Sequence, residues 1–492
     1  MTLPSARVRL PMWLRYVSAL AALFIYFAQY LTVPPNSSEG AVMMDYVHRL
    51  AEGQRLHFDV FDYYGPIAWL PYSFFYELAG QQLIGVRVLL LLLKLAAVIL
   101  TFALIRRLSD RFHASLGALT VAVLVGQPWP FFQIPYAPHL TFPMLLGVWL
   151  LILPLKTEAR WPQIAGAALV TGLLLWTKVN TGAYVLAGVA LYLGYWAPLR
   201  GSQRASAGKS EKAVRVAQWL GLIFVALAFN AFIREHLNTL YFVYLSLPLL
   251  VALAWTVWHL DEQAAAGKST RPNWIAAFAY VTGSLLVWAV VLLAYFGVEG
   301  GKGYLAEQWT VLSRFNYESA LLPPGAKGQY RGFNRYFWPQ LPWLTTGIAL
   351  YWLFSRRKRR KVSSAAAFEL AEARLAGLFI AGTLHGFVIY ARGDEVHLVQ
   401  GVVAAAVVLF GMLGVLQGVP LETRPRRIPR RWIVGLVTLL AAATIFAPPR
   451  LVDFSITFGD WASPRLSYLR YHSDRDDRAD ELPVGMTYAE WD

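Results

Sequence analysis

The sequence predicts an all-α integral membrane protein with about thirteen transmembrane helices. The composition indicates a membrane protein, because 57% of the 492 residues are hydrophobic and only 15% are charged, whereas roughly 25% are charged in a soluble domain. Apolar runs also recur along the chain at lengths that suit helices crossing a bilayer. Finally, the strongly basic loops between these runs fall on one side when the runs alternate in direction.

The apolar runs are the expected spans. The run Val86–Ile105 contains only Arg87 and Lys94 as charged residues, and it is long enough to cross a hydrocarbon layer of roughly 30 Å. We expect spans at residues 12–33, 82–105, 113–127, 138–155, 162–177, 182–197, 216–233, 239–258, 274–297, 341–354, 371–390, 398–417 and 432–447.

Basic residues predict the orientation. If the N-terminus lies in the cytoplasm, the run Arg356–Lys361 and the other basic loops all lie on the cytoplasmic side, as the positive-inside rule requires. Removing one span would place that run outside, so the charges favour an odd number of spans. We therefore expect a membrane bundle over residues 1–447 with outer loops at 34–81 and 299–340, followed by an outer tail at 448–492.

Charge and cysteine content exclude several function classes. The net charge is +15, but the basic residues lie mostly in short loops, where topology and anionic lipid head groups account for them without nucleic acid. The chain has no cysteine, which excludes disulfides, thiol catalysis and metal sites with cysteine ligands. The first apolar run is too long for a signal-peptide core, so we interpret it as a retained span.

The start of the first outer loop offers a candidate catalytic group. Ser37 or Ser38 can cap a helix over residues 41–51, and Glu39 stands beside this cap where the chain leaves the bilayer. The apolar positions of the helix predict that it lies in the interface plane. A carboxylate here can reach a substrate at the membrane surface. The alternative is that Glu39 only interacts with the helix dipole.

The end of this loop adds polar and aromatic groups. Asp59 and Asp62 are either solvated loop charges or ligands for a sugar, an acceptor or a divalent cation, and the sequence carries no signature that establishes a metal site. Tyr63 and Tyr64 are either interfacial anchors or surfaces on which a sugar stacks. The sequence Gly65-Pro66 then leads toward the second span.

The loop resembles a known family. The acidic residue after the first span, the interfacial helix and the Asp-x-Phe-x-x-Tyr-Gly-Pro stretch at 59–66 are similar to the first periplasmic loop of polyprenyl-phosphate-dependent glycosyltransferases of the GT-C superfamily. The resemblance is greatest to family 39-like bacterial enzymes, which are related to protein O-mannosyltransferases and aminoarabinose transferases. It implies a GT-C-like fold in a bacterial cytoplasmic membrane, with the N-terminus cytoplasmic and the C-terminus periplasmic. It also implies that Glu39 is the catalytic carboxylate.

The chain departs from this family at three points. Many relatives have two consecutive acidic residues where this chain has Ser38 and Glu39, and a lysine where it has Gly65. Many also have an acidic residue in the loop after the third span. Here that loop, residues 127–139, contains only His139 as a group that titrates near neutral pH.

Two later stretches on the expected outer side extend the resemblance. They are Thr-Lys-Val-Asn-Thr-Gly at 177–182 and Arg-Gly-Asp-Glu-Val-His-Leu at 392–398. Arginine can bind a phosphate through two parallel hydrogen bonds, and lysine can bind it as a point charge. The residues that we assign to donor phosphate or sugar are Lys178, Asn180, Arg392, Asp394, His397, Asp59, Asp62, Tyr63, Tyr64 and His139.

Plainer roles are open for several of these residues. Lys178 can reach the interface as a lysine at a helix end, Arg392 can pair with Asp394 across a turn, and His397 can be an ordinary polar anchor. His385 is more simply a core histidine. Arg87 and Lys94 are intramembrane charges, which are usually functional or paired, but the sequence names no partner for either of them.

The predicted function is sugar transfer from a polyprenyl-phosphate donor to an acceptor hydroxyl of a lipid, glycan or protein on the outer face. An inverting displacement needs one carboxylate as base, and Glu39 is the candidate. The sequence establishes no cofactor and leaves the need for a divalent cation open, and the expected partners are the lipid-linked donor, the acceptor and membrane lipids. The other function classes are a secondary transporter or lipid flippase, an O-antigen ligase or polymerase with an outer loop at 299–340, and a membrane scaffold.

Overall fold

The computed structural model describes a helical chain. The described backbone covers residues 12–28, 31, 37–55, 64–125, 137–155, 160–197, 246–265, 274–318, 341–362, 364–390 and 395–418, with a few positions between 216 and 227. Side chains are described over a smaller set, which leaves out residues 37–43 and 387–402 among others. Within these ranges there is no strand. The helices are α1 (Met12–Ala28), α2 (Ser37–Ala51), the short 3₁₀ helix η2 (Pro66–Ala68), α3 (Leu70–Leu78), α4 (Leu83–Leu108), α5 (Arg111–Val125), α6 (Ala137–Ile152), α7 (Trp161–Thr177), α8 (Val179–Tyr195), α11 (Leu247–Ala265), α12 (Trp274–Glu318), α14 (Leu341–Val362), α15 (Ala365–Tyr390) and α16 (Glu395–Gly418).

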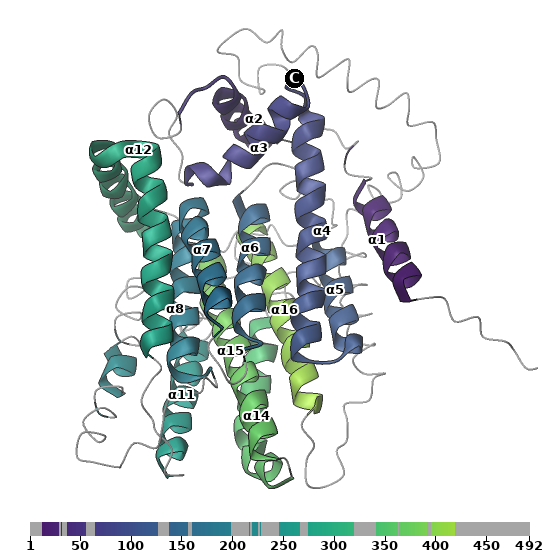
Figure 1. The fold of residues 1–492 in the computed structure, drawn as a ribbon, viewed down its shortest axis with the longest axis vertical. Coiled ribbons are helices and arrows are strands. Elements are labelled where there is room, and N and C mark those ends of the chain that lie inside the picture. Colours follow the sequence, from purple (N-terminus) through teal and green to yellow (C-terminus); the bar gives the residue numbers. More distant parts are fainter. Residues whose placement is uncertain are drawn as a thin grey trace, which may run out of the picture.

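Most of these helices pack side by side in one bundle. In Figure 1 they run roughly along the long axis, with α4 packed on α5, α6 on α7, α7 on α12 and α15 on α16. The short helices α2 and α3 lie across one end of the bundle, beside the start of α4 (Figure 1). We call this the α2–α3 end; α14 marks the opposite end.

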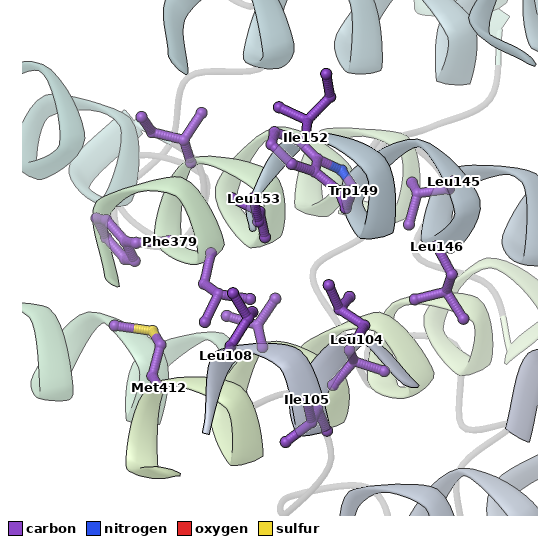
Figure 2. Packing of buried hydrophobic residues seen from close by; sticks show 14 of the residues in the cluster. Leu104, Ile105, Leu108, Leu145, Leu146, Trp149, Ile152, Leu153, Phe379 and Met412 are labelled. Carbon is purple, nitrogen blue, oxygen red and sulfur yellow. The ribbon is translucent and has the colours of Figure 1, made fainter. Parts of the chain in front are cut away.

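The centre of the bundle is a continuous apolar core. Figure 2 shows how Leu104 and Leu108 of α4, Leu146 and Trp149 of α6 and Met412 of α16 belong to one packed cluster. Burying one such side chain fully contributes about 1.5–3 kcal/mol relative to leaving it in water. This shared core therefore fixes the positions of the helices that carry the polar groups described below.

Two described helices are long and apolar enough to cross a membrane. They are α4 and the first part of α12, Trp274–Val298. Shorter apolar helices lie at Val17–Ala28, Arg111–Val125, His139–Ile152 and Val403–Gly418. The outward face of α12 exposes large apolar side chains, including Ile275 and Phe278. Such a surface suits contact with lipid. These features agree with a membrane protein, whereas the expected number of about thirteen spans is not confirmed.

The helix α12 extends further than the sequence suggested. We expected an outer loop from residue 299, but helix continues to Glu318. Gly297 interrupts it with φ of 67°, a left-handed conformation that glycine adopts without steric cost. Good helix formers such as Leu305 and Ala306 follow, which explains why a helix resumes after the bend. The expected span at 432–447 and the tail at 448–492 lie outside the described residues.

A buried ionic network joins α11, α14 and α15 toward the end opposite α2 and α3. Arg356 donates from Nη2 to Glu372 Oε2 at 2.9 Å and also pairs with Glu372 through Nε. The indole N–H groups of Trp255 and Trp352 each donate to Glu372 Oε1 at 3.4 Å. Both charged side chains are buried, so these donors replace the water that the carboxylate has lost.

We predict that Glu372→Gln destabilises the fold by about 3 kcal/mol, because it removes the buried carboxylate of the pair and leaves Arg356 with only the partly exposed Glu262. Thermal unfolding of the purified protein in detergent measures the loss. The matched control is Arg360→Gln, since Arg360 is half-exposed and pairs with Glu262 at 2.8 Å. An exposed pair contributes about 0–1 kcal/mol. Equal losses in the two variants would contradict the assigned role of the network.

Candidate functional site at the α2–α3 end

Glu39 lies in the first turn of a helix. The helix α2 begins at Ser37, so the two serines expected as caps are part of the helix and Glu39 is its third residue. Only the backbone of Glu39 is described. A position in the first turn places the residue where the helix dipole favours a negative charge.

Several predicted site residues are outside the described part of the chain. These are Asp59, Asp62, Tyr63, Arg392 and Asp394. His397 is the third residue of α16, and only its backbone is described. The roles assigned to Arg392, Asp394 and His397 therefore stay predictions.

The two halves of the first outer loop pack on each other. Val47 and Leu50 of α2 are buried in one cluster with Trp69 and Tyr72, and Leu140 of α6 packs against the same cluster. The apolar face of α2 thus contacts protein, where the sequence suggested the interface plane. The loop is a folded unit that rests on the long helices.

The sequence did not predict the helix α3. Unlike α2, this helix has an exposed apolar stripe. Leu70, Phe74 and Leu78 recur every four residues and are 42%, 59% and 72% exposed. Its opposite face buries Tyr72 and Tyr76. Such a two-faced helix can lie at the boundary between the bilayer and water.

Gly65 joins this loop to α7. Its backbone φ of −72° is open to any residue, but a Cβ at this position would overlap the carbonyl oxygen of Trp176. Only a hydrogen atom fits where the two backbones approach. This contact leaves no room for a side chain at position 65, and it docks η2 on α7.

The break between α7 and α8 places Lys178 beneath the loop. Lys178 is extended, with φ of −154° and ψ of 99°, and stands between the end of α7 and the start of α8. Its side chain is only 7% exposed, and Nζ lies 5.7 Å from the centre of the Tyr64 ring. Two predicted site residues, far apart in the sequence, therefore meet through a cation–π contact.

The residues after Lys178 shape the break. Asn180 Oδ1 accepts the backbone N–H of Thr181 at 2.7 Å, and the N–H of Gly182 donates to the Lys178 carbonyl at 3.0 Å. A Cβ on Gly182 would lie 2.7 Å from the backbone of Leu175. The small residue lets α8 start directly against α7. The oxygen of Asn180 thus has a local structural role.

A stack of aromatic rings holds α7 against α12. Trp176 stacks on Tyr304, with centroids 5.4 Å apart, and on Phe296, with centroids 5.8 Å apart. The Trp176 indole also donates to the Trp288 carbonyl at 2.7 Å. Because Gly65 touches the backbone of Trp176, this stack indirectly positions the first outer loop.

A second polar feature is a small cavity inside the bundle. Lys94 of α4, His139 of α6 and His385 of α15 line a space of about 40 Å³. The sequence predicted His139 as a site residue, indicated no partner for Lys94 and favoured a core role for His385. No local pattern could bring these residues together, because each stands on a different helix.

The described side chains include one buried cation next to the loop, Lys178, and their His, Asp and Glu residues are dispersed. Among them, no group of three His, Asp or Glu residues could hold a metal ion. The buried ammonium of Lys178 can instead pair with a phosphate oxygen, and a low-dielectric surrounding strengthens that interaction.

No family model matches the sequence, and no curated protein matches it. Among solved structures, the chain is similar to the Archaeoglobus fulgidus oligosaccharyltransferase AglB in complex with an inhibitory peptide and a dolichol-phosphate. The TM-score is 0.43 and the identity 12%, over 97% of this chain and 61% of that chain. The same archaeal enzyme in complex with Zn and sulfate gives a TM-score of 0.39 at 13% identity, over 87% of this chain and 51% of that chain.

A bacterial protein is also similar. ArnT from Cupriavidus metallidurans bound to undecaprenyl phosphate gives a TM-score of 0.31 at 16% identity, over 82% of this chain and 78% of that chain. The chain spans between 51% and 61% of the length of the archaeal structures. Because every TM-score is below 0.5, these likenesses establish no ligand or activity for this chain.

We predict that Gly65→Ala displaces the loop from α7, because the added methyl group meets a backbone carbonyl that cannot rotate away. Overpacking of this kind costs about 1–3 kcal/mol. The buried Lys178 should then react faster with an amine reagent, which peptide mass spectrometry can quantify.

The control for this variant is Gly147→Ala in α6, where an added Cβ meets nothing within 4 Å. Alanine is the better helix former, so this change should leave stability equal or higher. Unaltered Lys178 labelling in Gly65→Ala would show that the contact does not position the loop.

Proposed function

We propose that the chain is a membrane glycosyltransferase. It transfers a sugar from a polyprenyl-phosphate donor to an acceptor hydroxyl of a lipid, glycan or protein on the outer face, with Glu39 as the general base. The observation that carries the proposal is the contact between the Tyr64-Gly65 segment and the break at Lys178. These segments belong to two of the three short stretches in which the sequence resembles GT-C enzymes.

The burial and position of Lys178 support its role in binding the donor phosphate. It is a buried cation at the end of the bundle where the chain turns between two helices, next to a loop unit whose α3 exposes apolar side chains. A lipid-phosphate donor needs a cation near the membrane boundary and an apolar surface for its tail. The Tyr64 ring keeps the ammonium in place by cation–π attraction. Arg392 and His397 are the further cations assigned to the donor.

The position of Glu39 on the same loop unit supports its role as the general base. The helix α2 is attached through Val47 and Leu50 to Trp69, which lies 6.1 Å from Tyr64 between ring centroids. In an inverting displacement the carboxylate accepts the proton of the acceptor hydroxyl while that oxygen bonds to the anomeric carbon. The bond from that carbon to the phosphate oxygen breaks, and the phosphate leaves with the electron pair. Asp59 and Asp62 are assigned to sugar hydroxyls or to a divalent cation.

We predict that Glu39→Gln lowers turnover by about 10²–10⁴-fold, because it removes the base and keeps the shape. The assay uses the purified chain, a panel of synthetic polyprenyl-phosphate sugars and a membrane lipid extract as acceptor, with and without a chelator. Donor binding should persist in the variant. Turnover equal to that of the natural chain would remove Glu39 from the mechanism, and no consumption of any donor by a folded protein would favour the transporter or ligase hypotheses.

We predict that Lys178→Met raises the KM for the donor about tenfold, with a smaller effect on kcat, because a charged hydrogen bond to the phosphate is lost. The control is Lys302→Met, which removes an exposed lysine on α12. Donor titrations in the same assay give both constants. An equal KM in the two variants would contradict a phosphate contact by Lys178.

A further inference from the structure

Three basic side chains line the cavity inside the bundle. Lys94 and His385 are 4% and 7% exposed, and His139 joins them from a third helix. The space of about 40 Å³ exceeds the roughly 10–15 Å³ that one water molecule needs. It is therefore roomy enough to hold more than a single water.

The helix directions explain why these residues converge. The helix α4 begins at the α2–α3 end, and Lys94 lies eleven residues after Leu83, which is roughly 16 Å at 1.5 Å per residue. Side chains on a helix lean toward its N-terminus, so the lysine leans back toward this end. His139 is near the start of α6 and His385 near the end of α15. The cavity thus lies within the bundle, below the outer ends of its helices.

Charge and polarity define what such a space can bind. The ammonium form of Lys94 and protonated imidazoles of His139 and His385 would place positive charge on three sides of the space. A second cation is disfavoured there, which makes a metal site through the two histidines a poor fit. Of the described lining residues, Thr141 adds a hydroxyl and the rest are apolar. A compact oxyanion with up to two charges matches these donors.

We propose that this cavity binds one phosphate monoester group through Lys94, His139 and His385, with the Thr141 hydroxyl as a further donor. The site is distinct from Lys178, because Lys178 is not among the residues that line the cavity. Pro143 lines the cavity, whereas Met144 accepts a hydrogen bond from Thr177 at 3.8 Å. The chemistry is the same for a free phosphate that enters from water and for the head group of a prenyl phosphate. The inference stands independently of sugar transfer.

The test is a calorimetric titration of the purified full chain with two probes, inorganic phosphate and farnesyl phosphate. Lys94→Met and His385→Gln should each weaken the probe that binds by about tenfold or more, because each removes a charged or polar donor. Lys302→Met should bind as the natural chain does. Comparable affinity for the two probes identifies free phosphate as the source, and farnesyl phosphate binding more than tenfold tighter identifies a lipid.

Three results would overturn the site: no binding of either probe at millimolar concentration, unchanged binding in both cavity variants, or binding lost only in Lys178→Met. If Lys94→Met fails to fold, His385→Gln and His139→Gln carry the test, since both keep a polar side chain of similar size. Glu39→Gln should bind both probes normally. A failure of sugar transfer can therefore be distinguished from a failure of this site.

Discussion

The close approach of Gly65 to the Trp176 carbonyl is the constraint on which the α2–α3 end depends. Because only a hydrogen atom fits between these backbones, η2 can rest on α7 and Tyr64 can lie over Lys178. Trp176 is in turn held by its stack with Phe296 and Tyr304 on α12. One glycine thus connects a loop near the start of the chain to helices in its middle.

The two ends of the bundle differ in the buried charged groups that they contain. Toward the opposite end, Glu372 pairs with Arg356 and accepts two tryptophan N–H groups, and Arg356 also pairs with Glu262. Toward the α2–α3 end, the buried groups are predominantly basic, with Lys178 in the helix break and Lys94 in the cavity. A network closed within the chain suits a structural role, whereas a concentration of basic groups suits an anionic ligand.

The helices of the first outer loop have one buried face and one exposed face. The inner sides of α2 and α3 share buried residues such as Val47 and Tyr72, which attach the loop to the bundle. The outer side of α3 exposes Phe74 and Leu78. This arrangement gives the loop a fixed position on the protein and leaves an apolar face of α3 exposed.

The sequence by itself determined the class of the protein, the position of most helices and the helix break at Lys178. These features depend on local composition, since a long apolar run must become a helix in a membrane and a polar Lys-x-Asn-x-Gly stretch interrupts it. It also indicated the helix that carries Glu39. Where it failed locally, at α3 and at the continuation of α12 beyond Gly297, the helices were stabilised by packing that no hydropathy profile contains.

The tertiary structure alone decided which residues meet. The docking of Gly65, the contact of Tyr64 with Lys178 and the cavity shared by Lys94, His139 and His385 each join residues far apart along the chain. Such contacts follow from how helices pack around the common core, and a periodic pattern in one segment carries no information about the partner segment. The sequence could therefore nominate Lys178 and His139, but only the packing of α4, α6 and α15 gave Lys94 and His385 a shared site.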